Sequence, residues 1–145
     1  MKYLLDTCII SELIARQPNQ SVLEWINAQP AEALHISVVT LGEIAKGIRK
    51  LPESRRKATL THWLNADLPN RFAGRIQILD VETMLQWGEL VGSLEQQARS
   101  LPALDSLIAA IALRGTFQLV TRNVKDFDGI GIEIINPFKL NSGQQ

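Results

Sequence analysis

The sequence predicts an α/β protein built on a mostly parallel sheet of about five strands. Short runs rich in β-branched and apolar residues alternate along the chain with segments whose apolar residues recur at helical spacing. Of the 145 residues, 46% are hydrophobic and 21% charged, which is an ordinary composition for one globular core. No repeat, low-complexity tract or linker divides the chain, so we expect a single domain over residues 1–145 with a carboxyl-terminal tail from about residue 139.

The predicted elements alternate from the amino terminus onward. The runs with the length and composition of strands are residues 3–5, 34–39, 76–79, 118–121 and 132–135. Helices are predicted between them, at residues 9–14, 21–28, 40–50, 52–66, 81–94 and 102–115.

Local signals set the ends of these helices. Thr40 and Glu43 have the spacing of a capping box, which predicts that a helix begins there. Pro52 and Pro102 are placed to open the following helices, because proline is tolerated in a first helical turn. Gly115 ends the last helix, and a strand follows it.

Composition excludes several classes of protein. The 15 Lys and Arg residues balance the 15 Asp and Glu residues, so no overall charge attracts nucleic acid. The longest apolar run, residues 107–113, is far shorter than the ~20 residues that span a bilayer, and we expect no membrane partner. The single cysteine, Cys8, and an amino terminus without an export signal favour a cytoplasmic protein.

Acidic and amide side chains gather at the predicted strand ends. Asp6 closes the first strand, Glu43 follows the second, and Asn123 and Asp126 follow the fourth, while Asp105 opens the helix that leads into that strand. In a parallel sheet these positions face one crevice at the carboxyl edge. Carboxylates packed together need a cation, and oxygen ligands suit Mg²⁺ or Mn²⁺. The pattern therefore indicates metal-assisted hydrolysis of a phosphodiester.

Each acid also has a purely structural interpretation. Asp6 can cap the first helix, and Glu43 occupies the N3 position of the capping box. Asp105 lies in a first turn, where the helix dipole favours an acid, and Asp126 can be an ordinary loop residue. Their shared location at strand ends is what favours a site.

A basic segment, residues 46–57, offers a second candidate feature. It can form a rim that contacts phosphates, although a solvated helix face is the interpretation we favour. Its basic residues are Lys46, Arg49, Lys50, Arg55, Arg56 and Lys57. His35 and His62 lack the spacing of metal ligands, so no zinc site is predicted.

Four stretches of the chain resemble the PIN-domain ribonucleases, most closely the VapC and FitB type. They are Leu4–Leu13, Ile36–Ile48, Leu104–Ala110 and Leu119–Phe127. The resemblance implies a three-layer α/β/α fold and an acidic pocket that binds Mg²⁺ or Mn²⁺, where a metal-activated water cleaves RNA.

The resemblance also implies roles for individual residues. Asp6 and Asp105 correspond to the principal metal ligands, Glu43 binds metal or orients water, and Thr7 supports the site. Many relatives have an acid where this chain has Asn123, and Asp126 is the candidate for the missing carboxylate.

Relatives of this type imply partners as well. They are toxins of toxin–antitoxin pairs that form homodimers and are held inactive by a small antitoxin. We expect the dimer surface on the first helices, around Ile9, Leu13 and Trp25.

Two other functions compete with a nuclease toxin. A phosphoacceptor module of the receiver type would use Asp80, which closes the third strand. A nuclease fold that only binds RNA or a partner would explain Asn123 as the mark of a weakened site.

Overall fold

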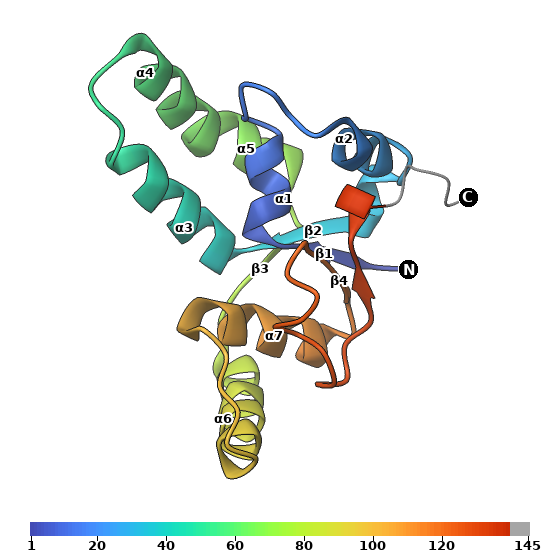
Figure 1. Cartoon of the computed structure of the whole chain (residues 1–145). Coiled ribbons are helices and arrows are strands. Elements are labelled where there is room, and N and C mark those ends of the chain that lie inside the picture. The colour runs from blue at the N-terminus through green and yellow to red at the C-terminus, as the bar shows by residue number, and fades with distance from the viewer. Residues whose placement is uncertain (140–145) are drawn as a thin grey trace.

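The computed structural model describes residues 1–139, which contain a five-stranded sheet in the order β3-β2-β1-β4-β5 (Figure 1). All four neighbouring pairs run parallel, with Leu4 on β1 opposite His35 on one side and Leu119 on the other. The strands are β1 (Tyr3–Leu5), β2 (Leu34–Ser37), β3 (Ile76–Gln77), β4 (Gln118–Val120) and β5 (Ile134–Ile135). The predicted parallel sheet of five strands is confirmed.

Helices cover both faces of the sheet and complete three layers (Figure 1). Helices α1 to α5 lie on one face, and α6 and α7 lie on the other. Their bounds are α1 (Thr7–Glu12), α2 (Gln20–Asn27), α3 (Val38–Arg49), α4 (Arg55–His62), α5 (Leu68–Arg71), α6 (Val81–Gln96) and α7 (Ala103–Gly115). Short 3₁₀ turns lie at η1 (Ala31–Ala33) and η3 (Pro137–Lys139).

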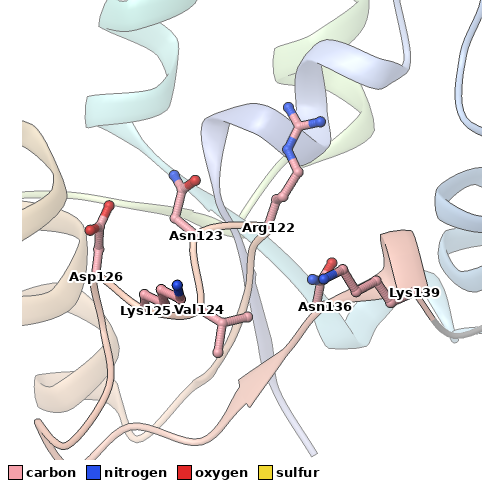
Figure 2. A pocket seen from close by; sticks show the side chains of 7 residues that line it. All are labelled: Arg122, Asn123, Val124, Lys125, Asp126, Asn136 and Lys139. Carbon is pink, nitrogen blue, oxygen red and sulfur yellow. The ribbon is translucent and has the colours of Figure 1, made fainter.

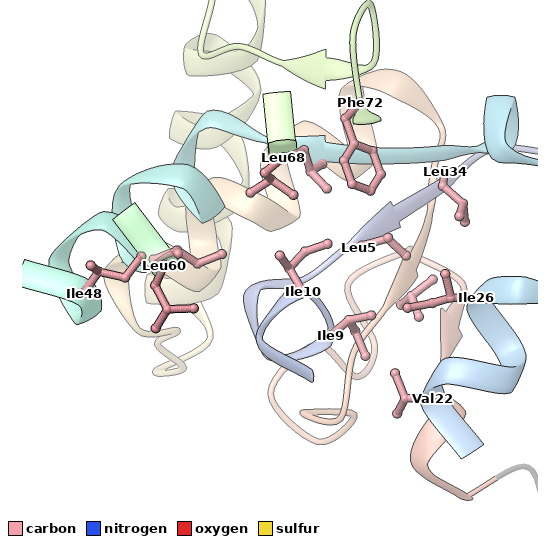
Figure 3. Close-up of a cluster of buried hydrophobic side chains, with 13 residues drawn as sticks. Leu5, Ile9, Ile10, Val22, Ile26, Leu34, Ile48, Leu60, Leu68 and Phe72 are labelled. Atoms are coloured by element: carbon pink, nitrogen blue, oxygen red, sulfur yellow. The ribbon is translucent and has the colours of Figure 1, made fainter. Parts of the chain in front are cut away.

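Two apolar clusters hold the layers together. The first cluster packs helices α1 to α5 against β1 and β2 and includes Ile9, Ile10 and Phe72, all fully buried (Figure 3). The second packs α6 and α7 against the other face, around Leu119 and Phe127. Because both faces of the central strands are covered, β1 and β4 read as continuous apolar runs rather than alternating ones.

The start of α3 differs from the capping box predicted at Thr40 and Glu43. Ser37 is the N-cap residue, since its hydroxyl accepts a hydrogen bond from the backbone N–H of Thr40 at 3.2 Å, and the helix begins at Val38. The second strand is correspondingly shorter than predicted. Thr40 and Glu43 therefore lie inside the helix, and Glu43 is free of the capping role.

The helical region after α3 also begins later than Pro52. Ser54 caps α4 through the N–H of Lys57, at 3.1 Å. Past His62 the helix continues through one π-helical stretch, η2 (Trp63–Asp67), before α5. The third and fifth strands are shorter than predicted, because β3 ends at Gln77 and β5 begins at Ile134.

No helix within residues 1–139 is both long and apolar enough to cross a bilayer. The carboxyl-terminal tail predicted from residue 139 starts with Lys139, which belongs to η3, and its remaining positions lie outside the described residues.

Candidate active site

Asp6 occupies the centre of the carboxyl edge, directly after β1. Its side chain is 3% exposed and receives hydrogen bonds from the N–H of Thr7 at 2.8 Å and from the hydroxyl of Thr121 at 2.7 Å. Burial raises the pKa of Asp6, and the charge of Glu43 raises it further, against the lowering effect of these hydrogen bonds. Asp6 is thus both the N-cap of α1, as one interpretation predicted, and a buried acid facing other carboxylates.

Glu43 reaches the same edge from the second turn of α3. The hydroxyl of Thr7 donates a short hydrogen bond to the Glu43 carboxylate. The Thr7 and Thr40 hydroxyls lie 3.0 Å apart, and since Thr7 has already donated its only proton, Thr40 donates to Thr7. These two hydrogen bonds fix the Glu43 side chain beside α1, which is the kind of supporting role that was predicted for Thr7.

Asp105 approaches from the other layer, in the first turn of α7. Desolvation raises its pKa to about 6, and the charges of Asp6, Asp126 and Glu43 contribute in the same direction. Three carboxylates from separate elements therefore act on Asp105. We refer to Asp6, Glu43, Asp105 and Asp126 as the acid cluster.

The loop after β4 carries the remaining candidates. The hydroxyl of Thr121 accepts a hydrogen bond from the N–H of Asn123 at 3.0 Å, so the loop is tied to Asp6 through Thr121. Asn123 and Asp126 are exposed and line one side of a hollow of about 660 Å³ (Figure 2). Asp126, rather than Asn123, supplies the charge that acts on Asp105.

The acid cluster suits a hydrated divalent cation. Among residues 1–139, no group of three His, Cys, Asp or Glu side chains is arranged so that it could hold a metal ion by itself. Mg²⁺ keeps several waters and binds through one or two carboxylates, so it does not need three protein ligands. Desolvation raises the pKa of Asp105, the charges of Asp6, Asp126 and Glu43 add to it, and a cation would offset that repulsion.

Thr40 and Thr121 were missed as members of the site. Both are fully buried and both hold an acid or its partner in place. The available signal is position, since each threonine follows a strand of the parallel sheet, at the edge where Asp6 lies.

Asp80 is not part of the acid cluster, and its carboxylate caps a helix. It caps α6, accepting from the N–H of Thr83 at 2.8 Å, and the hydrogen bonds from Thr83 lower its pKa. A structural cap accounts for Asp80.

Part of the basic segment is structural. The ammonium group of Lys57 donates to the carbonyls of Arg49 and Leu51, both at 3.1 Å, and Arg56 donates to the carbonyl of Ile14 at 2.9 Å. These two side chains bind the ends of α3 and α1 and are not directed at a ligand.

Comparison with known proteins identifies the family of the chain. The profile of the family described as PIN domain matches residues 3–132. The plasmid stability protein StbB of Pseudomonas syringae pv. tomato is 36% identical over 136 residues, covering 94% of this chain and 98% of that protein. A VapC ribonuclease of Sinorhizobium fredii is 31% identical over 94% of this chain and 97% of that protein.

Solved structures show the same likeness. The FitAcB complex from Neisseria gonorrhoeae contains a chain that superposes with a TM-score of 0.90 at 28% identity, covering 95% of this chain and 99% of that one. The sequence profile spans nearly all of the described elements, and the solved structure has the same overall fold. The chain belongs to the PIN domain family.

Proposed function

We propose that this protein is an endoribonuclease that depends on Mg²⁺ or Mn²⁺ and acts as the toxin of a toxin–antitoxin pair. The observation that carries the proposal is the acid cluster, in which carboxylates that follow β1 and β4 meet those of α3 and α7 at the carboxyl edge of the sheet. Desolvation, together with the charges of the other three acids, raises the pKa of Asp105 to about 6. The similar proteins include named ribonucleases, and their action on RNA supports RNA as the substrate and the cytoplasm as its place of action.

The acids divide into ligands and supports. Asp6 and Asp105 would hold the cation from opposite layers, with Glu43 as a further ligand or as the group that orients a water. When bound, the ion would neutralise the acids, offset charge on the phosphate oxygens and lower the pKa of a bound water. Thr7 orients Glu43, while Thr121 keeps Asp6 in place by donating to it.

Asp126 completes the site in place of an acid at position 123. Its charge acts on Asp105, whereas Asn123 contributes a neutral amide beside it. One or two carboxylate ligands with further acids nearby are sufficient for hydrated Mg²⁺.

The first experiment compares induced expression of the wild type, Asp6→Asn and Asp105→Asn. The wild type should arrest growth and produce discrete new RNA ends. Each variant should fold yet lose cleavage by more than about 100-fold, since the charge that holds the cation is reduced. Asp67→Asn, an exposed aspartate on η2, is the matched control and should behave as the wild type.

Two results contradict the proposal. If all four proteins leave RNA intact while the wild type binds RNA in the presence of Mn²⁺, the chain is a binding protein on a nuclease fold. If the Asn variants cleave as the wild type does, the acid cluster is not the site.

An antitoxin and a second copy of the chain are the proposed protein partners. Several similar solved structures are toxin–antitoxin complexes, including one of FitAB bound to DNA. Of the residues predicted for the dimer surface, Ile9 is fully buried, and Leu13 and Trp25 are partly buried against the first core cluster.

An exposed apolar patch lies elsewhere, at the junction of β3 and α6 and on α7. Its members are Ile78, Leu79, Val81, Met84, Leu85 and Leu104. Val81 and Leu85 are 76% and 68% exposed, which is unfavourable for a monomer and typical of an interface. We place the second copy of the chain on this patch.

A further inference from the structure

The loop after β4 lines a hollow that the acid cluster does not account for. Its volume is about 660 Å³, and Figure 2 shows the side chains of Arg122, Asn123 and Asp126 rising from the same loop along it. The other lining residues are Val124, Lys125, Asn136 and Lys139. Three of the lining residues are cationic and one is acidic, so this basic hollow has the opposite charge to the adjoining acid cluster.

Arg122 is held in place without being neutralised. Its guanidinium carbon lies 4.4 Å from the centre of the Phe138 ring, a cation–π contact that restricts a long side chain. Within residues 1–139 the guanidinium has no carboxylate partner. An exposed, pre-oriented guanidinium keeps its planar set of donors for an anion.

Asn136 adds a fixed donor to the same hollow. Its side-chain oxygen accepts from the N–H of Phe138 at 3.1 Å, which leaves its amide N–H groups for another partner. Lys125 and Lys139 contribute ammonium groups that are likewise without carboxylate partners in the described part of the chain. The hollow therefore presents mainly donors.

We propose that the basic hollow binds the backbone phosphate of single-stranded RNA next to the scissile bond, with Arg122 as the residue that positions it. This proposal rests on the proposed nuclease function. Asn123 and Asp126 line the hollow, and the charge of Asp126 acts on Asp105, so the basic hollow adjoins the acid cluster where the scissile phosphate would bind. A phosphate contact of this kind sets the register of the strand and carries no base preference.

The test measures RNA binding rather than cleavage. A fluorescein-labelled 12-nucleotide single-stranded RNA is titrated with the whole protein in EDTA, and fluorescence anisotropy gives Kd at several salt concentrations. Arg122→Gln should raise Kd about tenfold and reduce the slope of log Kd against log salt by about 0.7, the value for one phosphate contact on a single strand. Arg122→Lys, which keeps the charge, should keep most of the slope.

Arg71→Gln is the matched control. Arg71 is also exposed and lies over a phenylalanine ring, at 5.8 Å from the centre of Phe72, but it does not line the hollow. Its Kd and salt slope should equal those of the wild type. With Mn²⁺ added, Arg122→Gln should raise KM more than it lowers kcat, because its contact forms before and during the reaction alike.

Four outcomes overturn the proposal. If Arg122→Gln has the same Kd and the same salt dependence as the wild type, the hollow binds another ligand, such as an acidic protein segment. Loss of binding in Arg49→Gln alone would place the RNA on the basic segment. If the wild type cleaves RNA and Arg122→Gln matches it in every measurement, only the proposal for the hollow is refuted. If the wild type neither binds nor cleaves RNA, the nuclease function is refuted as well.

Discussion

Asp105 links the electrostatics of the site to the stability of the fold. Its pKa is raised to about 6 in the folded protein, from an ordinary value of 3.8, by desolvation and by three neighbouring acids. Between these values the folded state holds more protons than the unfolded state, so the free energy of unfolding decreases as pH rises through this window. Asp6, whose pKa is also raised, contributes in the same direction.

Asp105→Asn should therefore stabilise the metal-free protein above pH 6. We expect a gain of about 1–2 kcal/mol at pH 7.5, allowing for partial solvent screening, and no gain at pH 4, where the wild-type carboxyl is already neutral. Urea unfolding in EDTA from pH 4 to 8 measures this difference. Mg²⁺ should raise the melting temperature of the wild type and leave that of the variant nearly unchanged, and a variant less stable than the wild type at pH 7.5 contradicts the prediction.

Thr121 is the residue that makes a buried Asp6 tolerable. Thr121→Val removes the donor 2.7 Å from the Asp6 carboxylate and leaves that buried oxygen with only the Cys8 thiol, at 3.9 Å. We expect a loss of about 1–3 kcal/mol at pH 7.5 in EDTA, and a smaller loss at pH 4, because burial raises the pKa of Asp6 and a larger fraction of the carboxyl is neutral at the lower pH. Thr59→Val, on the exposed side of α4, is the control in the same urea series and should change stability by less than about 0.5 kcal/mol. Equal losses at both pH values would assign Thr121 a packing role only.

The acids of the candidate site were proposed from the sequence, and its threonines were not. Asp6, Asp105 and Asp126 were proposed because charged groups at the ends of apolar strands are conspicuous. Thr40 and Thr121 also follow strands, but a threonine there is ordinary in sequence, and only the fold shows their hydroxyl groups bonded to Thr7 and to Asp6.

Among the helices, α3 was predicted correctly as an element, but its N-cap residue was predicted wrongly. Two residues suited to an N-cap were available, Ser37 and Thr40, and only Thr40 is followed by a Glu at the third position after it. Tertiary contacts decide between them, because the Thr40 hydroxyl is buried against Thr7 and Glu43 is required at the carboxyl edge. The shift of three residues turned Glu43 from a cap into a member of the site.

One polar side chain, Lys57, adds to the apolar packing between α3 and α4. The Lys57 ammonium group is largely buried and binds two carbonyls at the end of α3 together with the Glu53 carboxylate at 3.0 Å. Cations at a helix C-terminus satisfy the last carbonyls and complement the dipole.

Lys57→Met should therefore lower the free energy of unfolding by about 1–2 kcal/mol while leaving the RNA affinity of the folded protein within about twofold. Arg55→Met, at the exposed start of α4, is the control for loss of a charge and should be neutral in stability. Thermal unfolding and RNA anisotropy on the three proteins give both values. A large loss of RNA affinity in Lys57→Met, with stability unchanged, would show that the basic segment binds the substrate after all.

For the molecule as a whole, the order of the layers could be predicted from the sequence, whereas the position of the exposed apolar surface could not. Alternating strand and helix patterns specify a parallel sheet covered on both faces, and the apolar runs of β1 and β4 follow from that burial. Which helices remain uncovered depends on how the layers pack. Ile9 and Val81 both belong to helical apolar patterns, yet the first is fully buried and the second is 76% exposed.

The apolar patch also has a position that matters for the site. Leu79 and Leu104 line a groove of about 240 Å³ together with Glu43 and Lys46, so the patch adjoins the acid cluster. A two-fold contact through the patch would use the same surface on both copies and bring their two acid clusters towards one interface.

The double variant Val81→Glu with Leu85→Glu should convert a dimer into a monomer, because four carboxylates would meet in an apolar contact. Light scattering over a concentration series should give the mass of two chains for the wild type and one for the variant. Ala73→Glu adds a charge at an exposed position outside the patch and should leave the dimer intact. A double variant that stays dimeric would move the interface to another surface, whereas a monomeric variant that still cleaves RNA in Mn²⁺ would show that each acid cluster works within one chain.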